Sequence, residues 1–338
     1  GFCRGAVVHS SRRNVMSPPV NPAIIRIVPR SIRVAAMRIF FAFGVTILFL
    51  LFPPPGPVRA ATVDWNSLVG RLVADGFSRV AMEPLFVRPE VHFEPDAMAD
   101  KISSLVQNQA PPDSMIARLK QAIRRDYLSR RSIALARAYI GENRTLLEQI
   151  DLLYGVPKEI VVSILMIETH LGRKTGESRV FNRLASMTLS NDLETVRPHL
   201  SRGLLTPENE EFARSRCREK SDWAYGELKA LLRFAERNGI DPIEIRGSVY
   251  GAIGQCQFMP SNIFSYGVDA DQDGRIDLFT KEDALHSIAN YLRGHGWQPG
   301  LDREGQHRVI FDYNRSTVYA NTVLAIAGKL KDRDGKRP

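Results

Sequence analysis

Residues 156–172 read VPKEIVVSILMIETHLG, and this stretch decides the fold class. Pro157 suits the first position of a helix, where its missing N–H costs nothing. Val161, Ile164 and Leu165 then follow at spacings of three and four, the periodicity of an apolar helix face. The stretch therefore predicts a helix whose apolar face is buried.

One carboxylate interrupts this face. Glu168 lies four residues after Ile164 and seven after Val161, so it occupies the next position on the same stripe. Burial disfavours the charged form of a carboxyl group, and we therefore expect a raised pKa for Glu168. A raised pKa lets a carboxylic acid donate a proton near neutral pH. The alternative is a structural glutamate paired with an arginine such as Arg173 or Arg179.

Helical periodicity continues on both sides of this stretch. It recurs in residues 113–138, 143–154, 223–238, 283–294 and 317–331. Strand signals are few, and residues 308–313 are the best strand candidate. The sequence therefore predicts a mainly α fold with a small β element.

Composition and charge limit the function classes. The chain has 338 residues, of which 44% are apolar and 25% charged, as in a globular protein. Residues 1–60 hold eight arginines and no lysine or acid, so they carry eight of the nine net positive charges. The remainder is close to neutral and lacks the basic surface of a nucleic-acid binder. Nucleic acid is therefore excluded as a predicted partner.

Residues 37–60 have the parts of a secretory signal peptide. A charged start at Met37-Arg38 precedes the apolar run 39–52, and Val58-Arg59-Ala60 forms a small-x-small exit. A transmembrane anchor is the alternative, but the run is shorter than the ~20 residues that a spanning helix needs. We expect cleavage after Ala60, no transmembrane anchor in the mature chain, and a soluble periplasmic protein. No cysteine follows the run, so a lipid anchor is not indicated.

Residues 1–36 show no periodic pattern, and the chain opens with Gly1 rather than Met. We interpret this part as an upstream segment, with Met37 as the expected start of translation. Residues 61–338 are then expected to form the catalytic region.

Residues 269–277 read DADQDGRID, which matches three quarters of an EF-hand loop. Acids stand at positions 1, 3, 5 and 9, namely Asp269, Asp271, Asp273 and Asp277. Position 12 is Thr280 instead of the usual glutamate. Four acids in one turn repel one another unless they bind a cation. An acidic surface turn without a cation is therefore the weaker alternative. The loop predicts one structural Ca²⁺, with a backbone carbonyl from Arg275 among its ligands.

Four blocks of sequence together resemble the lytic murein transglycosylases of the B type, over roughly residues 90–330. In chain order the blocks are IETHLGR (167–173) with RVFNRLA (179–185), GSVYGAIGQCQFMPS (247–261), ANYLRGHGW (289–297), and YNRS (313–316) with Tyr319. The second block is the most specific. The resemblance implies a lysozyme-like catalytic core with additional helices.

The resemblance also implies roles for single residues. Glu168 is then the sole acid/base catalyst, and the sugar groove is lined by Ser248, Gln257, Tyr291, Asn314 and Tyr319. Amides and hydroxyls suit sugar hydroxyl and acetamido groups, and aromatic faces stack on sugar rings. For the two tyrosines, a core aromatic with a satisfied hydroxyl stays open. In the family the calcium loop is longer, and its closing carboxylate corresponds to Asp283.

The implied activity is cleavage of the β-1,4 bond between MurNAc and GlcNAc in peptidoglycan strands, leaving 1,6-anhydroMurNAc ends. A lysozyme-type hydrolase is one alternative, which would need a second carboxylate, with Asp192 as the candidate. A calcium-dependent glycan-binding module without turnover is the other. It would fit an ionised, ion-paired Glu168.

Two features depart from the family pattern. Members with a short loop after the helix of the catalytic glutamate carry an arginine pair there, whereas residues 188–198 read TLSNDLETVRP and an insertion follows up to Cys217. The second feature is Cys256, beside Gln257. In an oxidising compartment two cysteines fit one disulfide as well as two buried thiols. A bridge between Cys217 and Cys256 would pin the insertion over the active site.

Overall fold

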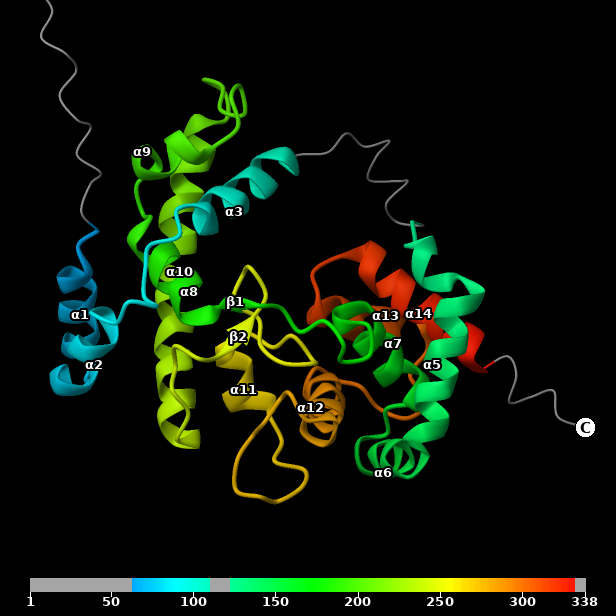
Figure 1. The fold of residues 1–338 in the computed structure, drawn as a ribbon. Helices are drawn as coiled ribbons and strands as arrows, with labels where there is room; N and C mark the ends of the chain where they lie inside the picture. Colours follow the sequence, from blue (N-terminus) through cyan, green and yellow to red (C-terminus); the bar gives the residue numbers. More distant parts are fainter. Residues whose placement is uncertain (1–62, 110–121, 332–338) are drawn as a thin grey trace, which may run out of the picture. The chain divides into compact units, whose positions relative to one another are not determined.

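The computed structural model describes residues 63–109 and 122–331. Within them the chain is mainly helical, with one two-stranded sheet (Figure 1). The expected mainly α fold with a small β element is thus confirmed. The upstream segment 1–36 and the signal peptide 37–60, with its cleavage point, lie outside the described residues. No helix of the described part is both long and apolar enough to cross a membrane.

The elements follow one another in the order α1 (Trp65–Ala74), α2 (Arg79–Phe86), α3 (Asp96–Gln107), η1 (Arg125–Leu128), α5 (Arg130–Glu142), α6 (Arg144–Tyr154), α7 (Lys158–Thr169), β1 (Ser178–Arg179), α8 (Val180–Leu189), α9 (Leu193–Val196), η2 (Arg197–His199), α10 (Glu210–Asn238), β2 (Arg246–Gly247), α11 (Pro260–Tyr266), α12 (Lys281–Gly294), α13 (Arg303–Tyr313) and α14 (Thr317–Lys331).

Helix α7 lies at the centre of one group of helices. Its residues from Glu159 to Ile167 are all buried, and α5, α6, α12 and α14 pack against it. The helix ends abruptly because His170, Leu171 and Gly172 have φ angles of 51°, 63° and 80°. Such a run of left-handed residues is uncommon outside glycine and turns the chain back on itself. Glu168 therefore lies in the last turn of α7, directly before the loop that follows the helix.

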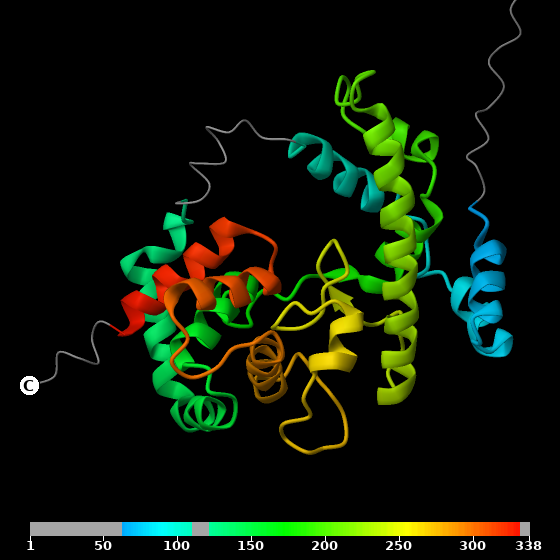
Figure 2. The same cartoon turned by 180° about the vertical axis from the view of Figure 1, so that it is seen from behind.

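Helix α10 organises the second group. It packs against α3, α8 and α11 (Figure 2). Leu228, Leu231, Leu232 and Ala235 are buried, as the periodicity of residues 223–238 predicts. The helix begins earlier than that pattern, and its first turns are built from the inserted segment. It ends at Gly239, whose φ of 63° suits a helix C-terminus.

The small sheet connects these two groups. Strand β1 follows the loop after α7, and it pairs antiparallel with β2 through Ser178 opposite Gly247 and Arg179 opposite Arg246. The approach is close at Gly176, which has a φ of 94° and where a Cβ would lie 2.2 Å from the carbonyl oxygen of Gly247. Only glycine fits there without displacing backbone. The pairing holds the loop after β2 next to the segment that leaves Glu168.

Two element predictions were wrong. Residues 308–313 are not a strand but the end of α13, because Asp302 caps the helix by accepting from the Gly305 N–H at 2.8 Å. The predicted helix 113–138 is interrupted within its described part. Residues 122–124 are not helical, and Ser129 starts α5 by accepting a hydrogen bond from the Ser132 N–H.

Candidate functional site

Glu168 is half-buried and is surrounded by tyrosines from distant parts of the chain. Its electrostatic neighbours are the hydroxyls of Tyr127, Tyr313 and Tyr319 and the thiol of Cys256. The Tyr319 hydroxyl is buried beside the carboxyl group and makes no hydrogen bond of ordinary length and angle. Burial raises the pKa of Tyr313 and Tyr319, so both hydroxyls stay neutral. The carboxyl group therefore has no charged neighbour among these side chains.

Desolvation controls the protonation of Glu168. Burial raises its pKa from 4.5 to about 7, and the polar contact with Tyr319 offsets only part of that rise. Among the described residues no arginine pairs with Glu168, and Arg179 instead contacts Glu244 at 2.9 Å. The ion-paired structural glutamate is therefore not what the structure contains. A carboxylic acid with this pKa can donate a proton and later accept one near neutral pH.

The raised pKa predicts a pH-dependent stability. Unfolded Glu168 releases its proton near pH 4.5, whereas the folded protein retains it up to about pH 7. The stabilisation from this group is thus fully present below pH 4.5 and is lost as the pH rises to about 7. We expect Glu168→Gln to melt at increasingly higher temperature than the wild type between these two values. Thermal melts of both proteins from pH 4 to pH 9 measure this, and a pH-independent difference would contradict it.

A loop of residues 254–258 covers the end of α7. The hydroxyl of Thr169, which follows Glu168, donates to the Gln255 carbonyl at 2.9 Å. The Gln257 side-chain N–H donates to the carbonyls of Thr175 and Gly254, each at 2.9 Å. Gln257 also has a φ of 54°, an uncommon conformation that often marks functional sites. The structure thus brings Gln257 to the loop that leaves Glu168.

Ser248 lies at the start of the loop after β2. Its hydroxyl oxygen accepts hydrogen bonds from the N–H groups of Tyr250 and Ala252, at 3.3 and 3.0 Å. The hydroxyl hydrogen remains available to a ligand. Because Gly247 pairs with β1, Ser248 and Gln257 both border the segment between Glu168 and β1.

The other three predicted groove residues differ in their surroundings. Tyr291 is only 7% exposed, donates to the Asp312 carbonyl at 2.8 Å and stacks on His295. It therefore fits the alternative of a core aromatic with a satisfied hydroxyl. Tyr319 is equally buried, but its hydroxyl faces Glu168. Asn314 is exposed at the end of α13 and is free to contact a ligand.

Sequence reasoning missed two tyrosines of the site. Tyr313 donates to the Cys256 carbonyl at 2.6 Å and so fixes the loop over α7. Tyr127 donates to the Ile167 carbonyl at 3.3 Å, directly before Glu168. Tyr313 could have been found because it directly precedes Asn314 in the fourth block. Tyr127 carries no local signal, since it reaches the site only through the packing of η1 against α14.

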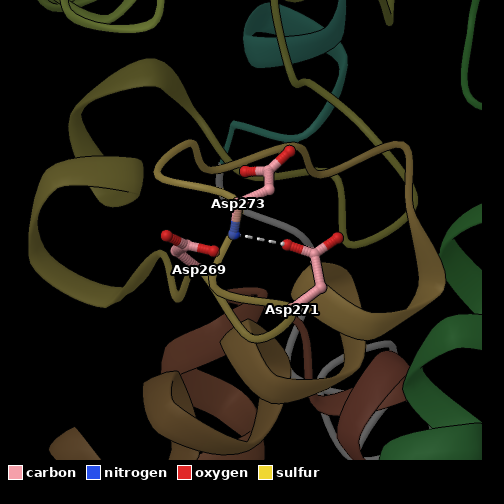
Figure 3. Close-up of side chains that lie close together, drawn as sticks. All are labelled: Asp269, Asp271 and Asp273. Carbon is pink, nitrogen blue, oxygen red and sulfur yellow. Dashed lines mark hydrogen bonds between the residues drawn. The ribbon is translucent and has the colours of Figure 1, made fainter.

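The predicted calcium loop brings three aspartates together. One carboxylate oxygen each from Asp269, Asp271 and Asp273 lies within 4.8 Å of the others (Figure 3). Their remaining contacts shape the loop, as when Asp273 accepts from the Arg275 N–H at 2.8 Å. One oxygen of Asp269 is buried and has no hydrogen-bond partner. Converging oxygens with one left unsatisfied fit a hard cation such as Ca²⁺.

Asp283 does not join this group. It is 1% exposed, and its two oxygens accept from the N–H groups of Ala270 and Asp277 at 2.8 and 2.7 Å. Asp283 therefore braces the loop through its backbone, close enough to Asp269 and Asp271 to feel their charges. Its role as the closing ligand stays a prediction. Burial raises the pKa of Asp283, and the charges of Asp271 and Asp269 add to the rise.

Of the two alternatives for the cysteines, the structure contains the pair of buried thiols. Cys217 and Cys256 are both free and buried. Cys217 lies on α10 near Asp192 and Arg214, whereas Cys256 lies beside Glu168 and Phe258. The two thiols thus belong to different neighbourhoods. Packing against α8, rather than a bridge to Cys256, holds α10 in place.

The candidate second carboxylate lies elsewhere. Asp192 is the N-cap of α9, where it accepts from the Glu194 N–H at 3.2 Å, and it lies 3.6 Å from Arg214. It is not among the groups that influence Glu168. The arrangement can therefore supply one acid/base group, several neutral hydroxyls and a separate oxygen-lined cation site.

The sequence is similar to those of known transglycosylases. Residues 62–306 match the family described as the transglycosylase SLT domain. The membrane-bound lytic murein transglycosylase B of Escherichia coli K12 is 29% identical over 206 residues, which cover 60% of this chain and 50% of that protein. This chain therefore spans about half the length of the curated relative it matches.

Two solved structures share the fold. The soluble lytic transglycosylase SltB1 from Pseudomonas aeruginosa superposes with a TM-score of 0.60 at 24% identity, over 80% of this chain and 98% of that one. The E. coli lytic transglycosylase Slt35 in complex with calcium gives a TM-score of 0.55 at 23% identity, over 78% and 91% of the two chains. The expected lysozyme-like fold with additional helices is thus confirmed.

Proposed function

Because the chain belongs to the transglycosylase SLT domain family, we propose that it is a peptidoglycan lytic transglycosylase and that Glu168 is its acid/base catalyst. The observation that carries this proposal is the buried carboxyl group of Glu168, with a pKa of about 7 and no ion-pair partner. The similarity to a lytic murein transglycosylase supports the same substrate. The protein acts on glycan strands in the periplasm, after removal of residues 37–60.

In the first step Glu168 protonates the oxygen of the β-1,4 bond between MurNAc and GlcNAc. The bond between that oxygen and MurNAc C1 breaks, and positive charge develops at C1. The acetamido oxygen of the same MurNAc then bonds to C1. Glu168 is left as a carboxylate beside neutral tyrosine hydroxyls, and burial favours its return to the protonated form.

In the second step the Glu168 carboxylate removes the proton from the C6 hydroxyl of MurNAc. The C6 oxygen bonds to C1, the acetamido oxygen leaves, and a 1,6-anhydro ring closes. Glu168 regains its proton and the cycle is complete. Ser248, Gln257 and Asn314 hold the sugars, because their hydroxyl and amide groups border the segment next to Glu168 or remain exposed.

The two alternatives lack a supporting observation. A lysozyme-type hydrolase needs a second carboxylate near the bond, and Asp192 is occupied by α9 and Arg214. A glycan-binding module without turnover would suit an ion-paired Glu168, which the described residues do not contain. Mass analysis of products from purified peptidoglycan tests the assignment. We expect ends lighter by one water than ordinary reducing ends, and ordinary ends would favour hydrolysis.

The loop of Asp269, Asp271 and Asp273 binds one structural Ca²⁺ in this proposal, with the Arg275 carbonyl as a further ligand. The converging oxygens and the unsatisfied Asp269 oxygen support it, as does the calcium complex of Slt35. Asp283 holds the loop backbone and is the expected closing ligand. The cation would stabilise the connection between α11 and α12 and has no part in the chemical steps.

Calcium is expected to raise the melting temperature by mass action. A metal that binds only the folded protein stabilises it by roughly 3 kcal/mol at a hundredfold excess over its dissociation constant. A chelator should therefore lower the melting temperature of the wild type, and Asp273→Ala should lower it in calcium buffer and remove the chelator effect. Asp222→Ala, at an exposed aspartate of α10, is the matched control. An unchanged wild-type melt after chelation would refute the calcium site.

A further inference from the structure

Lys101 belongs to a cluster of basic and aromatic side chains. Its Nζ lies 4.7 Å from the ring centre of Tyr250 and 6.0 Å from that of Trp223. The Nζ of Lys220 lies 5.9 Å from the same Trp223 ring. Helix α3, helix α10 and the loop after β2 each contribute to this lysine–tryptophan cluster, which consists of Lys101, Lys220, Trp223 and Tyr250.

Lys101 is the cluster's cation without an ion-pair partner among the described residues. Lys101 is half-buried, and both its burial and the charge of Lys220 lower its pKa. Among the described residues no carboxylate lies within ion-pair distance of Lys101, whereas Glu219 contacts Lys220 at 2.9 Å. Two ammonium groups thus share one aromatic surface, with Glu219 beside Lys220 and Asp100 near Tyr250. The unpaired Lys101 is the group that an added anion would contact.

The cluster is held in place before any ligand arrives. Arg183 of α8 is buried, and its Nε donates to the Val249 carbonyl at 2.7 Å. The same guanidinium contacts Asp96 at 2.7 Å and Glu94 at 3.2 Å, at the start of α3. Arg183 therefore fastens the loop of Tyr250 to the helix that carries Lys101. A pre-organised site binds its ligand without a further ordering cost.

The cluster adjoins the residues that border the proposed groove. Tyr250 follows Ser248 by two positions, and its N–H donates to the Ser248 hydroxyl. Gln257 and Ser248 both border the segment that runs from Glu168 to β1. In Figure 1 the loop after β2 rises toward α3. Tyr250 therefore joins the cluster to Ser248, because it contacts both Ser248 and Lys101.

Resting on the proposed function, we propose that the lysine–tryptophan cluster binds the acidic stem peptide carried by the muramic acid residues of peptidoglycan. Lys101 and Lys220 contact its carboxylates through charge-assisted hydrogen bonds. Trp223 and Tyr250 contact its aliphatic parts. The site thereby makes strands that retain their stems better substrates than strands without them.

A binding experiment tests this without turnover. A free stem peptide with its carboxylates, and the same peptide with those groups amidated, are titrated by calorimetry onto Glu168→Gln and onto Glu168→Gln combined with Lys101→Met. We expect Lys101→Met to weaken binding of the acidic peptide about tenfold, or 1.4 kcal/mol. Binding of the amidated peptide should change by less than about twofold. Equal losses for both peptides, or none for either, would overturn the proposal.

Further variants separate charge from structure. Lys101→Arg keeps the positive charge and should retain binding of the acidic peptide within about threefold. Lys229→Met, nine residues after Lys220 on α10 and paired with Asp75, is the matched control and should not change binding. If Lys101→Met fails to fold, the wild-type preference for the acidic over the amidated peptide decides, and no preference overturns the proposal.

Failure of this site and failure of the proposed function give different results. If the wild type cleaves peptidoglycan but does not bind the acidic peptide, the cluster proposal alone is wrong. If the acidic peptide binds through Lys101 but no strand is cleaved, the transglycosylase assignment is wrong and the binding site stands.

Discussion

Replacing Glu168 with glutamine is expected to lower kcat by at least about 10²–10⁴-fold, the usual contribution of one positioned acid/base group. The amide keeps the shape of the side chain but can neither donate the first proton nor accept the second. Because Glu168 performs both steps in the proposed mechanism, no other described group can replace it. Steady-state kinetics on purified peptidoglycan measure the loss.

Glu159→Gln is the matched control for this variant. Glu159 is also buried on α7, two and a half turns before Glu168, and it lies 3.8 Å from Lys158. We expect its replacement to leave kcat nearly unchanged. Glycan binding and folding of Glu168→Gln should also be retained, because the substitution removes no packing. Turnover of Glu168→Gln within tenfold of the wild type would contradict the assignment of the catalyst.

The second large effect is expected at Gly176, where alanine should both destabilise the protein and impair catalysis. The residue has a φ of 94°, and an added Cβ would lie 2.2 Å from the Gly247 oxygen. Positive φ costs an alanine about 1–2 kcal/mol, and the clash is with backbone, which cannot move aside cheaply. Separation of β1 from β2 would shift Ser248, and a displacement of about 1 Å in a site can cost 10²-fold in rate.

Gly226→Ala in α10 is the control, because no atom lies within 4 Å of its added Cβ. There alanine should stabilise the protein by about 0.5–1 kcal/mol, since glycine is unfavourable in a helix. Thermal or chemical denaturation and kcat/KM are measured for both variants. A Gly176→Ala protein with wild-type stability and turnover would show that the pairing of β1 with β2 does not position the site.

The parts of the site that could be predicted from sequence are those encoded locally or by motif. Glu168 was predictable because the periodicity of its own helix places a carboxylate on the buried face. Ser248 and Gln257 came from the resemblance, and the structure brings both to the segment next to Glu168. Tyr127 was not predictable, because its contact with Ile167 depends on the packing of distant helices.

The wrong strand prediction has a physical reason. The apolar run at 308–313 has the composition of a strand, but the cap at Asp302 and the burial of Val309 and Ile310 make it helical, as tertiary context often does. The cysteine count left a bridge between Cys217 and Cys256 open beside two buried thiols, because a count carries no information on which elements bring thiols together.

The fate of the cleaved bond tests the central claim most directly. A tethered C6 hydroxyl can reach an effective molarity of about 10⁵ M in good geometry, against about 55 M for bulk water. Digestion of peptidoglycan by the wild-type protein in heavy-oxygen water, followed by mass analysis of the new MurNAc ends, distinguishes the two nucleophiles. We predict 1,6-anhydroMurNAc ends that contain no solvent oxygen. Heavy oxygen at those ends would show hydrolysis and contradict the transglycosylase mechanism.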